Sequence, residues 1–436
     1  MTNTYLVTQI KRISDPCIDA TARHAVRRVY LVDRETGLPC ELEQNYIDVV
    51  LGTKAVGTQD KAGDELAVFR QWRLIQSLKD KGWKDSLQRA LQSEPPMSSS
   101  EIDDFANSCS FKAGFLSRTL DALKNGVALD IYSSHETVSA ACLNGRIRTA
   151  KRFLTHLLNH GRKPANVQDL HFYPYISELK RSLETELQNK LVPVPKHSEV
   201  LSLNSVEVQA MELLLDNHPL FTNSVSAQRD SLIIRTLRET SFRAGELLKI
   251  KTEQVCEPSE LLPSPYMTTI RDPQSAEDCR KYEPAIKTRN GDVPISNELF
   301  KDLQNYILGP RRDAVDLRID GVETAYLFVN HEGDPEHIGK ETSQRNINRV
   351  VKKLTVHSAI RSSVHPHSLR HTGLTELADG AQERGRDGAE IEQLVTDIGR
   401  FTPGSPQVAH YTGRHVRAQT AKFKKTREDE IRGNKT

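Results

Sequence analysis

The sequence predicts a mainly α-helical protein, with an α+β second domain that adds a small β-sheet or hairpin to its helices. The chain has 436 residues, which suggests two or three domains. From Gly63 onward apolar residues recur at helical spacing, and capping residues mark helix starts. Pro193 and Pro195 interrupt the helical pattern, and Asn290-Gly291 is a strong turn signal in the second half of the chain.

The N-terminal residues 1–60 form an extension of uncertain structure. Two runs there have strand-like composition, Arg28–Val32 and Ile47–Leu51. Glu35-Thr36-Gly37 has the composition of a turn. This region therefore adds little to the assignment of the fold.

Residues 61–190 are predicted to form a helical domain. Ser98 and Glu101 have capping-box spacing at a helix start. Further helices are expected at about 111–125, 138–160 and 174–189. The stretch 146–163 lacks acidic residues, and its basic residues are Arg146, Arg148, Lys151, Arg152, Arg162 and Lys163. A solvated helix face and a DNA-contacting face both have this composition.

Residues 191–199 are predicted to be a linker, because paired prolines favour extended backbone and end the preceding helix. The second domain, 200–436, opens with expected helices at about 204–217 and 226–239, and Arg243 begins another helix. Strands are expected on both sides of Asn290-Gly291, at 285–288 and 292–295, and a short buried strand or edge at 326–329.

Later elements of the second domain are predicted by individual residues. Pro366 suits the first turn of a helix, and Gly380 suits its end. Ile391, Leu394, Val395 and Ile398 have helical spacing that ends at Gly399. The tail from about 412 to 430 is expected to be a basic helix.

Composition excludes several classes of protein. The formal net charge is only +2, so charge balance by itself does not indicate nucleic acid. The six cysteines are scattered without a C-x-x-C pair, which favours reduced thiols over a disulfide frame or zinc site. A transmembrane run and a signal peptide are not apparent, so a cytoplasmic protein without metal or cofactor is expected.

The most informative residues are His367, Arg370 and Tyr411. His367 and Arg370 lie three residues apart on an expected helix and therefore share a face. The guanidinium fork fits a phosphate, the imidazole can move a proton, and a tyrosine hydroxyl can act as nucleophile. Taken singly, each is more often a surface arginine, a packed histidine or a half-buried aromatic. Together they suffice to cut a phosphodiester without a metal.

This pattern resembles the active-site signature of tyrosine recombinases, the phage integrase family. Arg243 and Glu246-Leu247 are similar to the family's Arg-x-x-Glu-Leu box, with Glu246 as the structural acid. Lys287 corresponds to the lysine of the family's β-hairpin. The resemblance covers roughly residues 200–425. It implies that Arg243 and Arg370 bind the phosphate, that Lys287 protonates the leaving oxygen, and that His367 exchanges the proton of Tyr411.

One position departs from the family pattern. The family has Leu-Gly-His or Leu-Gly-Trp shortly before the tyrosine, whereas this chain has Ile398-Gly399-Arg400, slightly farther from Tyr411. Arg400 can donate hydrogen bonds to a phosphate but stays charged near neutral pH. We include Arg400 among the candidate catalytic residues, with His410 as the alternative third ligand.

The resemblance implies a site-specific recombinase or integrase, a helical core-binding domain and a catalytic domain that clamp double-stranded DNA, and a 3′-phosphotyrosyl intermediate. It also implies a homotetramer on paired sites, a mobile-element origin and possible accessory DNA-bending or directionality proteins. The predicted DNA contacts are Arg146, Arg148, Lys151 and Arg152. The alternatives are a type IB topoisomerase-like relaxing enzyme and a DNA-binding regulator with impaired catalysis.

Overall fold

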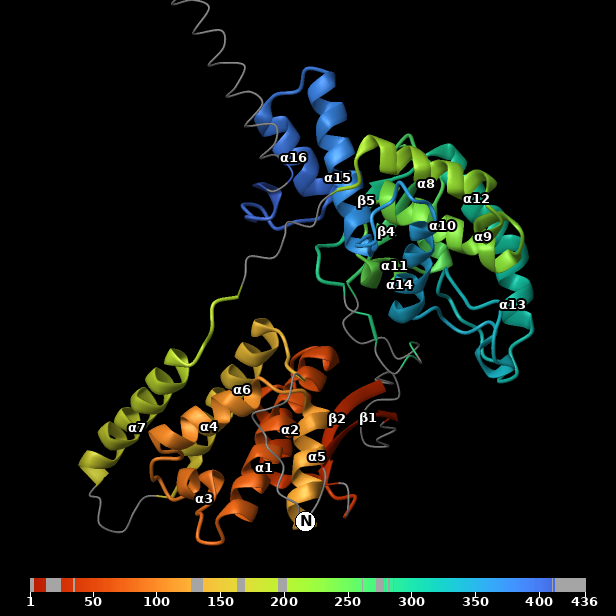
Figure 1. Cartoon of the computed structure of the whole chain (residues 1–436). Helices are drawn as coiled ribbons and strands as arrows, with labels where there is room; N and C mark the ends of the chain where they lie inside the picture. The colour runs from red at the N-terminus through yellow and green to blue at the C-terminus, as the bar shows by residue number, and fades with distance from the viewer. Residues whose placement is uncertain are drawn as a thin grey trace, which may run out of the picture. The chain divides into compact units, whose positions relative to one another are not determined.

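The computed structural model describes residues 4–12, 25–33, 36–126, 136–162, 169–194, 202–260, 262–271, 278, 280, 283–284, 286–409 and 411. The chain divides into two compact units, Met1–Lys196 and His197–Thr436, here called unit 1 and unit 2 (Figure 1). Helices dominate both units, and unit 2 contains a three-stranded antiparallel sheet. The predicted mainly α fold with a small β-sheet is confirmed.

Unit 1 is a β-hairpin followed by a helical bundle. Its elements are β1 (Thr4–Arg12), β2 (Ala25–Asp33), α1 (Glu41–Val50), α2 (Val56–Lys79), α3 (Ser86–Leu91), α4 (Ser99–Cys109), α5 (Ala113–Lys124), α6 (Ala140–His160) and α7 (Asp169–Asn189). The strands are antiparallel, with Thr4 opposite Asp33 and Arg12 opposite Ala25. The capping box predicted for Ser98 and Glu101 is present at the start of α4.

The expectation of a strand at Ile47–Leu51 is wrong, because Ile47 lies in α1. Glu43, Gln44, Tyr46 and Ile47 are buried together, which is the spacing of one helix face rather than the alternation of a strand. The Gln44 side chain fixes α1 to β2 through hydrogen bonds with the backbone of residues 29 and 31. Residues near the N-terminus therefore belong to the core of unit 1.

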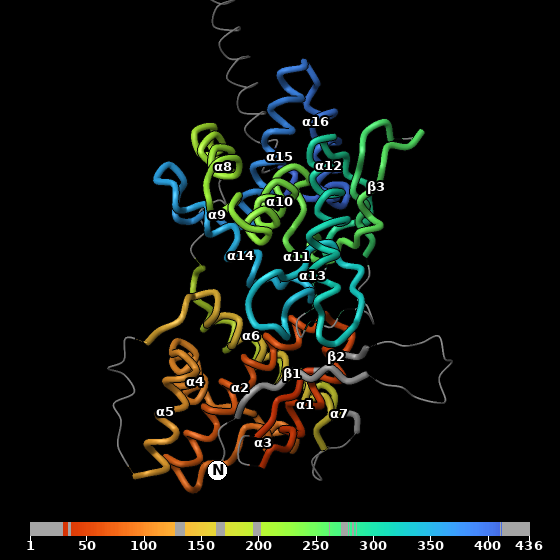
Figure 2. Tube along the Cα trace, turned by 90° about the vertical axis from the view of Figure 1, so that its right-hand side faces the viewer, coloured from red at the N-terminus to blue at the C-terminus, as the bar shows by residue number. Residues whose placement is uncertain are grey.

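The core of unit 1 is built around α2, which lies at the centre of this unit in Figures 1 and 2. Phe69 and Trp72 of α2 pack on Phe105 of α4, with ring centroids 5.1 and 5.3 Å apart, and Phe153 of α6 completes the cluster. All four rings are fully buried. Burying an aromatic side chain contributes about 1.5–3 kcal/mol, so this cluster is a major source of stability.

Unit 2 surrounds α10. Its helices are α8 (Ser205–Asn217), α9 (Pro219–Thr222), α10 (Val225–Glu239), α11 (Ala244–Lys249), α12 (Asn297–Tyr306), α13 (Arg312–Asp316), α14 (Gln344–Lys352), α15 (Pro366–Glu383) and α16 (Gly388–Ile398). The helix α10 contacts α9, α12, α14 and α15. Its buried apolar side chains join one continuous core with the sheet.

The sheet of unit 2 pairs β4 (Tyr266–Thr269) with β3 (Val255–Cys256) and β5 (Gly291–Pro294). The predicted hairpin between 285–288 and 292–295 is wrong, because β5 pairs with β4 and Gly291 lies opposite Thr269. The segment before Gly291 instead turns toward Glu246, where the Thr288 hydroxyl donates a hydrogen bond 2.9 Å long. A polar partner outside the sheet therefore overrides the local turn signal.

Helices α15 and α16 lie side by side in Figure 2 and form a small core with Phe401 and Tyr411. Pro366 occupies the first turn of α15, as predicted. The helix continues past Gly380 to Glu383, because Leu377 and Ala381 pack on α16. The helix α16 ends before Gly399, as predicted.

Within the described residues, no helix is both long and apolar enough to cross a bilayer. The same part of the chain contains no group of three metal-ligating side chains. The cysteines at 40, 109, 142 and 256 are free thiols. Lys163, Tyr282, His410 and the expected basic tail lie outside the described residues.

Candidate active site

A single buried carboxylate organises the candidate active site. Glu246 lies in the first turn of α11 and is fully buried. Its oxygens accept hydrogen bonds from the Arg243 backbone at 2.9 Å, the Arg243 guanidinium at 3.1 Å, Thr288 at 2.9 Å and Arg400 at 2.5 Å. Burial alone would raise the pKa of Glu246, but Arg400 and Arg370 outweigh burial and lower it. Glu246 is therefore ionised and holds the arginines together.

Arg243 is the N-cap residue of α11, as the sequence predicts. Its side chain is about one quarter exposed, so the guanidinium reaches the surface of the site. The second guanidinium nitrogen lies 3.4 Å from the Gln407 side-chain oxygen. Arg243 can therefore meet a ligand from solvent while Glu246 holds it from below.

Arg370 projects from the first turns of α15 and has no exposed surface. Its Nη1 donates to the carbonyl of Ser241, and its Nη2 donates to the carbonyl of Gly399 at 2.7 Å. Its Nε has no hydrogen-bond acceptor among the described residues. Burial and the neighbouring Arg243 lower the pKa of Arg370 to about 10. The guanidinium is thus rigid, still cationic and able to donate further hydrogen bonds.

Tyr411 is 6% exposed and belongs to the α15–α16 core. Its ring contacts His371 and Phe401, with centroids 5.0 and 5.9 Å away. Burial raises the pKa of Tyr411, and a hydrogen bond and charge interaction with Arg370 oppose this effect. The hydroxyl is therefore protonated at neutral pH and adjoins Arg370.

His367 lies on the exposed side of the first turns of α15. Partial desolvation and the nearby cations of Arg370 and Arg243 lower the pKa of His367 to about 4. Its ring meets that of His371 edge to face at 4.6 Å, and His371 in turn contacts Tyr411. The imidazole is neutral near pH 7, the form that can accept a proton.

Lys287 is exposed and lies between the buried Ile286 and Thr288. Because Thr288 bonds Glu246 and the Arg289 backbone donates to the Arg400 carbonyl at 3.2 Å, the segment is fixed beside the arginines. The lysine side chain remains free to reach outward on a long aliphatic stem.

Arg400 is turned into the protein. It is 2% exposed, its Nη2 pairs with Glu246 and its Nη1 donates to the Ile398 carbonyl at 2.9 Å. The guanidinium carbon lies 4.5 Å from the centre of the Phe242 ring. In this position Arg400 supports Glu246, which differs from the expectation of an outward phosphate donor.

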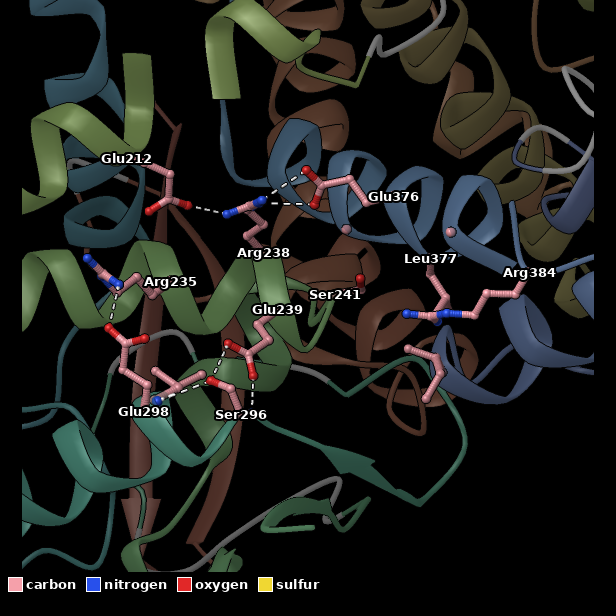
Figure 3. A pocket seen from close by; sticks show the side chains of 14 residues that line it. Glu212, Arg235, Arg238, Glu239, Ser241, Ser296, Glu298, Glu376, Leu377 and Arg384 are labelled. Carbon is pink, nitrogen blue, oxygen red and sulfur yellow. Dashed lines mark hydrogen bonds and ion pairs between the residues drawn. The ribbon is translucent and has the colours of Figure 1, made fainter. Parts of the chain in front are cut away.

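A pocket of about 440 Å³ lies behind Arg370, and Ser241 forms part of its floor (Figure 3). Arg238 of α10 spans it, bonding Glu376 of α15 at 2.9 Å and Glu212 of α8. Ser241 has a φ of 53°, which is uncommon for a residue other than glycine. These ion pairs join three helices around the turn that supplies the Ser241 carbonyl to Arg370.

The predicted DNA-contacting set on α6 is not uniform. Arg148 and Arg152 are exposed, and Lys151 is half-buried, 3.3 Å from the Gln188 oxygen. Arg146 is 6% exposed and donates to the carbonyls of Cys109 and Phe111. We therefore correct the assignment of Arg146, because its guanidinium ties α6 to the end of α4 instead of facing solvent.

Sequence reasoning missed two features of unit 2. The helix α14 buries Ile347, Val350 and Val351 and exposes a basic and amide-rich face made of Gln344, Arg345, Asn348, Arg349 and Lys352. The i, i+4 recurrence of Arg345 and Arg349 would have revealed it. Phe401, treated as part of a loop, lies 4.9 Å from the Arg370 guanidinium carbon. No sequence motif indicates that contact.

Comparisons with known proteins agree with this geometry. The model of the phage integrase family matches residues 205–392. A tyrosine recombinase of Pseudothermotoga lettingae is 26% identical over 247 residues, 52% of this chain and 74% of that protein. Tyrosine recombinase XerC of Staphylococcus carnosus is 25% identical over 207 residues, 44% of this chain and 56% of that protein. The chain belongs to the phage integrase family, the tyrosine-type site-specific recombinases.

Two solved structures are similar in outline. The Tn1549 transposon integrase, in complex with transposon right end DNA, has a TM-score of 0.41 and 15% identity over 81% of this chain and 98% of that chain. The XerH site-specific recombinase, bound to a palindromic difH substrate, has a TM-score of 0.39 and 12% identity over 79% of this chain and 98% of that chain.

Proposed function

We propose that this recombinase cuts and rejoins double-stranded DNA through a 3′-phosphotyrosyl intermediate on Tyr411. The observation that carries the proposal is the contact of a buried tyrosine hydroxyl with the rigid Arg370 guanidinium. Nucleophile and phosphate donor thus share one small core, and Glu246 adds Arg243 to the same group.

Each group has a chemical role in the proposed cleavage. The Tyr411 oxygen attacks phosphorus, its proton passes toward His367, and the phosphorus bond to the 5′-oxygen breaks. Lys287 supplies the proton that the leaving 5′-oxygen takes up. Arg243 and Arg370 stabilise the charge that grows on the non-bridging oxygens. Religation reverses these steps and conserves the bond energy, so the reaction needs no metal or nucleotide cofactor.

Double-stranded DNA is the proposed partner of both units. In unit 1, Arg148 and Arg152 expose two like charges one helical turn apart. In unit 2, the exposed face of α14 combines arginines with asparagine and glutamine, side chains that can bond phosphates and base edges. We propose that the units together clamp the duplex, and that a homotetramer acts on two paired sites, with accessory proteins possible.

The mobile-element role remains part of this proposal. A transposon integrase and chromosomal Xer-type recombinases are both among the similar proteins. DNA that flanks the gene distinguishes the two, because an integrated element is bounded by repeated ends. Repeated ends at the borders support the mobile element, and their absence supports a resident chromosomal recombinase.

One observation favours a second candidate, a DNA-binding regulator with impaired catalysis. Arg400 is bonded to Glu246 and Ile398, so this segment presents no third phosphate donor from that side chain. A topoisomerase-like enzyme is distinguished by relaxation of supercoiled plasmids that lack the flanking DNA. Formation of a covalent adduct excludes the regulator.

The test uses a supercoiled plasmid that carries the cloned flanking DNA. Reactions are stopped with detergent, the DNA is digested, and the peptide that carries a nucleotide is identified by mass spectrometry. We expect the adduct on Tyr411, its loss in Tyr411→Phe and its retention in Tyr326→Phe. Tyr326 is a matched control because it is a buried tyrosine of the same unit. An adduct that persists in Tyr411→Phe would assign the nucleophile elsewhere.

A further inference from the structure

The Phe401 ring contacts both arginines of the candidate site and the tyrosine. Its centre lies 4.9 Å from the Arg370 guanidinium carbon and 5.9 Å from that of Arg243. The Tyr411 ring lies 5.9 Å away, with 33° between the ring planes. Phe401 is 4% exposed. One buried ring therefore touches the nucleophile and two cations at once.

The end of α16 directs Phe401 into this position. The Phe401 backbone donates to the Thr396 carbonyl at 2.9 Å, and Arg400 donates to Asp397 at 3.0 Å, the two bonds of a Schellman motif. Arg400 occupies the left-handed position of this motif, with a φ of 52°. The reversal sends the Arg400 side chain to Glu246 and the next side chain to the arginines on the other side.

A second feature fits the ring. Gly399 has an ordinary negative φ, so backbone conformation does not require glycine there. A Cβ atom at Gly399 would collide with the Phe401 ring. The absence of that Cβ lets the ring lie against the end of α16, and the Gly399 carbonyl beside it accepts the Arg370 hydrogen bond.

We propose that Phe401 is a positioning residue for strand cleavage, an inference that rests on the proposed function of Tyr411. Its π face attracts the Arg370 and Arg243 guanidiniums, and its ring fixes the plane of Tyr411. The ring itself cannot donate a hydrogen bond to a phosphate. In this chain the segment before the tyrosine thus orients the arginines and the nucleophile by ring contacts, while Arg400 secures Glu246.

The test compares Phe401→Leu with Phe401→Tyr. Leucine fills much of the volume but has no ring, whereas tyrosine keeps the ring. With the plasmid substrate above, Phe401→Leu should slow single-turnover adduct formation about tenfold, which corresponds to about 1.4 kcal/mol. Its DNA affinity should not change, and Phe401→Tyr should stay within about threefold of the parent. Phe221→Leu is the control, because Phe221 is buried in the core of unit 2.

The control separates positioning from loss of core packing. Phe221→Leu should lower the melting temperature as much as Phe401→Leu and leave the adduct rate unchanged. Parent-like cleavage by Phe401→Leu, or an equal loss in Phe221→Leu, overturns the inference. If the parent forms no adduct, the proposed function fails. The NMR resonance of labelled Tyr411 in the free protein then decides, because it should shift in Phe401→Leu and an unchanged resonance refutes the contact.

Discussion

Replacement of Arg400 by alanine should destabilise unit 2 strongly. The Arg400–Glu246 pair is 2.5 Å long, and its side chains are 1% and 0% exposed. Removing one partner of a buried pair typically costs about 3–5 kcal/mol, because the other charge stays buried. Arg370 and Arg243 remain near Glu246 and reduce this cost, so we expect about 3 kcal/mol.

The backbone of Arg400 allows its side-chain contribution to be separated. With a φ of 52°, alanine at this position stays in the left-handed region, whereas glycine occupies it without strain. Arg400→Gly should therefore be about 1 kcal/mol more stable than Arg400→Ala, although both lack the ion pair. Arg386→Ala is the control. It removes an exposed i, i+4 pair with Glu390, which should contribute less than about 0.5 kcal/mol.

The assay must resolve the two units. The chain's two tryptophans, Trp72 and Trp83, both lie in unit 1, so tryptophan fluorescence follows that unit and serves as an internal reference. Calorimetry of the full chain reports both transitions. A transition of unit 2 that is unchanged in Arg400→Ala would refute the buried ion pair, and a shift of the tryptophan transition would show that the effect is not confined to unit 2.

Three further predictions concern catalysis, DNA binding and pH. Arg370→Ala and Arg243→Ala should each slow adduct formation at least about 100-fold, and near-parental rates with normal melting would remove that arginine from the clamp. Reversing the charges of Arg148 and Arg152 together should flatten the salt dependence of DNA binding by about 0.9 per lost phosphate contact, whereas the exposed control Lys81→Glu should not. Because the folded-state pKa of Glu246 is lowered, its stabilising effect is present above pH 4.5 and lost as pH falls through the lower value. Acid unfolding that is identical in Glu246→Gln would contradict this linkage.

The sequence predicted the helices that carry the site because their signals are local. Pro366 at the start of α15, the spacing in α16 and the start of α11 at Arg243 each involve residues within a few positions of one another. The partner of β5 was missed because strand pairing depends on distant residues, and Asn290-Gly291 suggested a nearer one. A turn signal specifies conformation at its own residues and leaves the partner strand open.

Side-chain direction was the least predictable property of the site. Arg146 and Arg148 are both arginines of one helix, yet the first is buried and the second is exposed. Arg400 was expected to face a phosphate and instead bonds Glu246. The residue that faces the arginines is the apolar neighbour Phe401, because a left-handed residue reverses the chain between them. Such reversals at helix ends carry weak sequence signals when the residue is not glycine.

The two carbonyls that hold Arg370 have a consequence for how this site tolerates sequence change. Its acceptors are the backbone oxygens of Ser241 and Gly399, atoms that every amino acid possesses. A point substitution at either position cannot delete the acceptor and can act only by bending the turn. Insertions or deletions in these two turns would move both oxygens and release the guanidinium. Variation in chain length there, more than variation in residue type, should therefore separate active from inactive relatives of this chain.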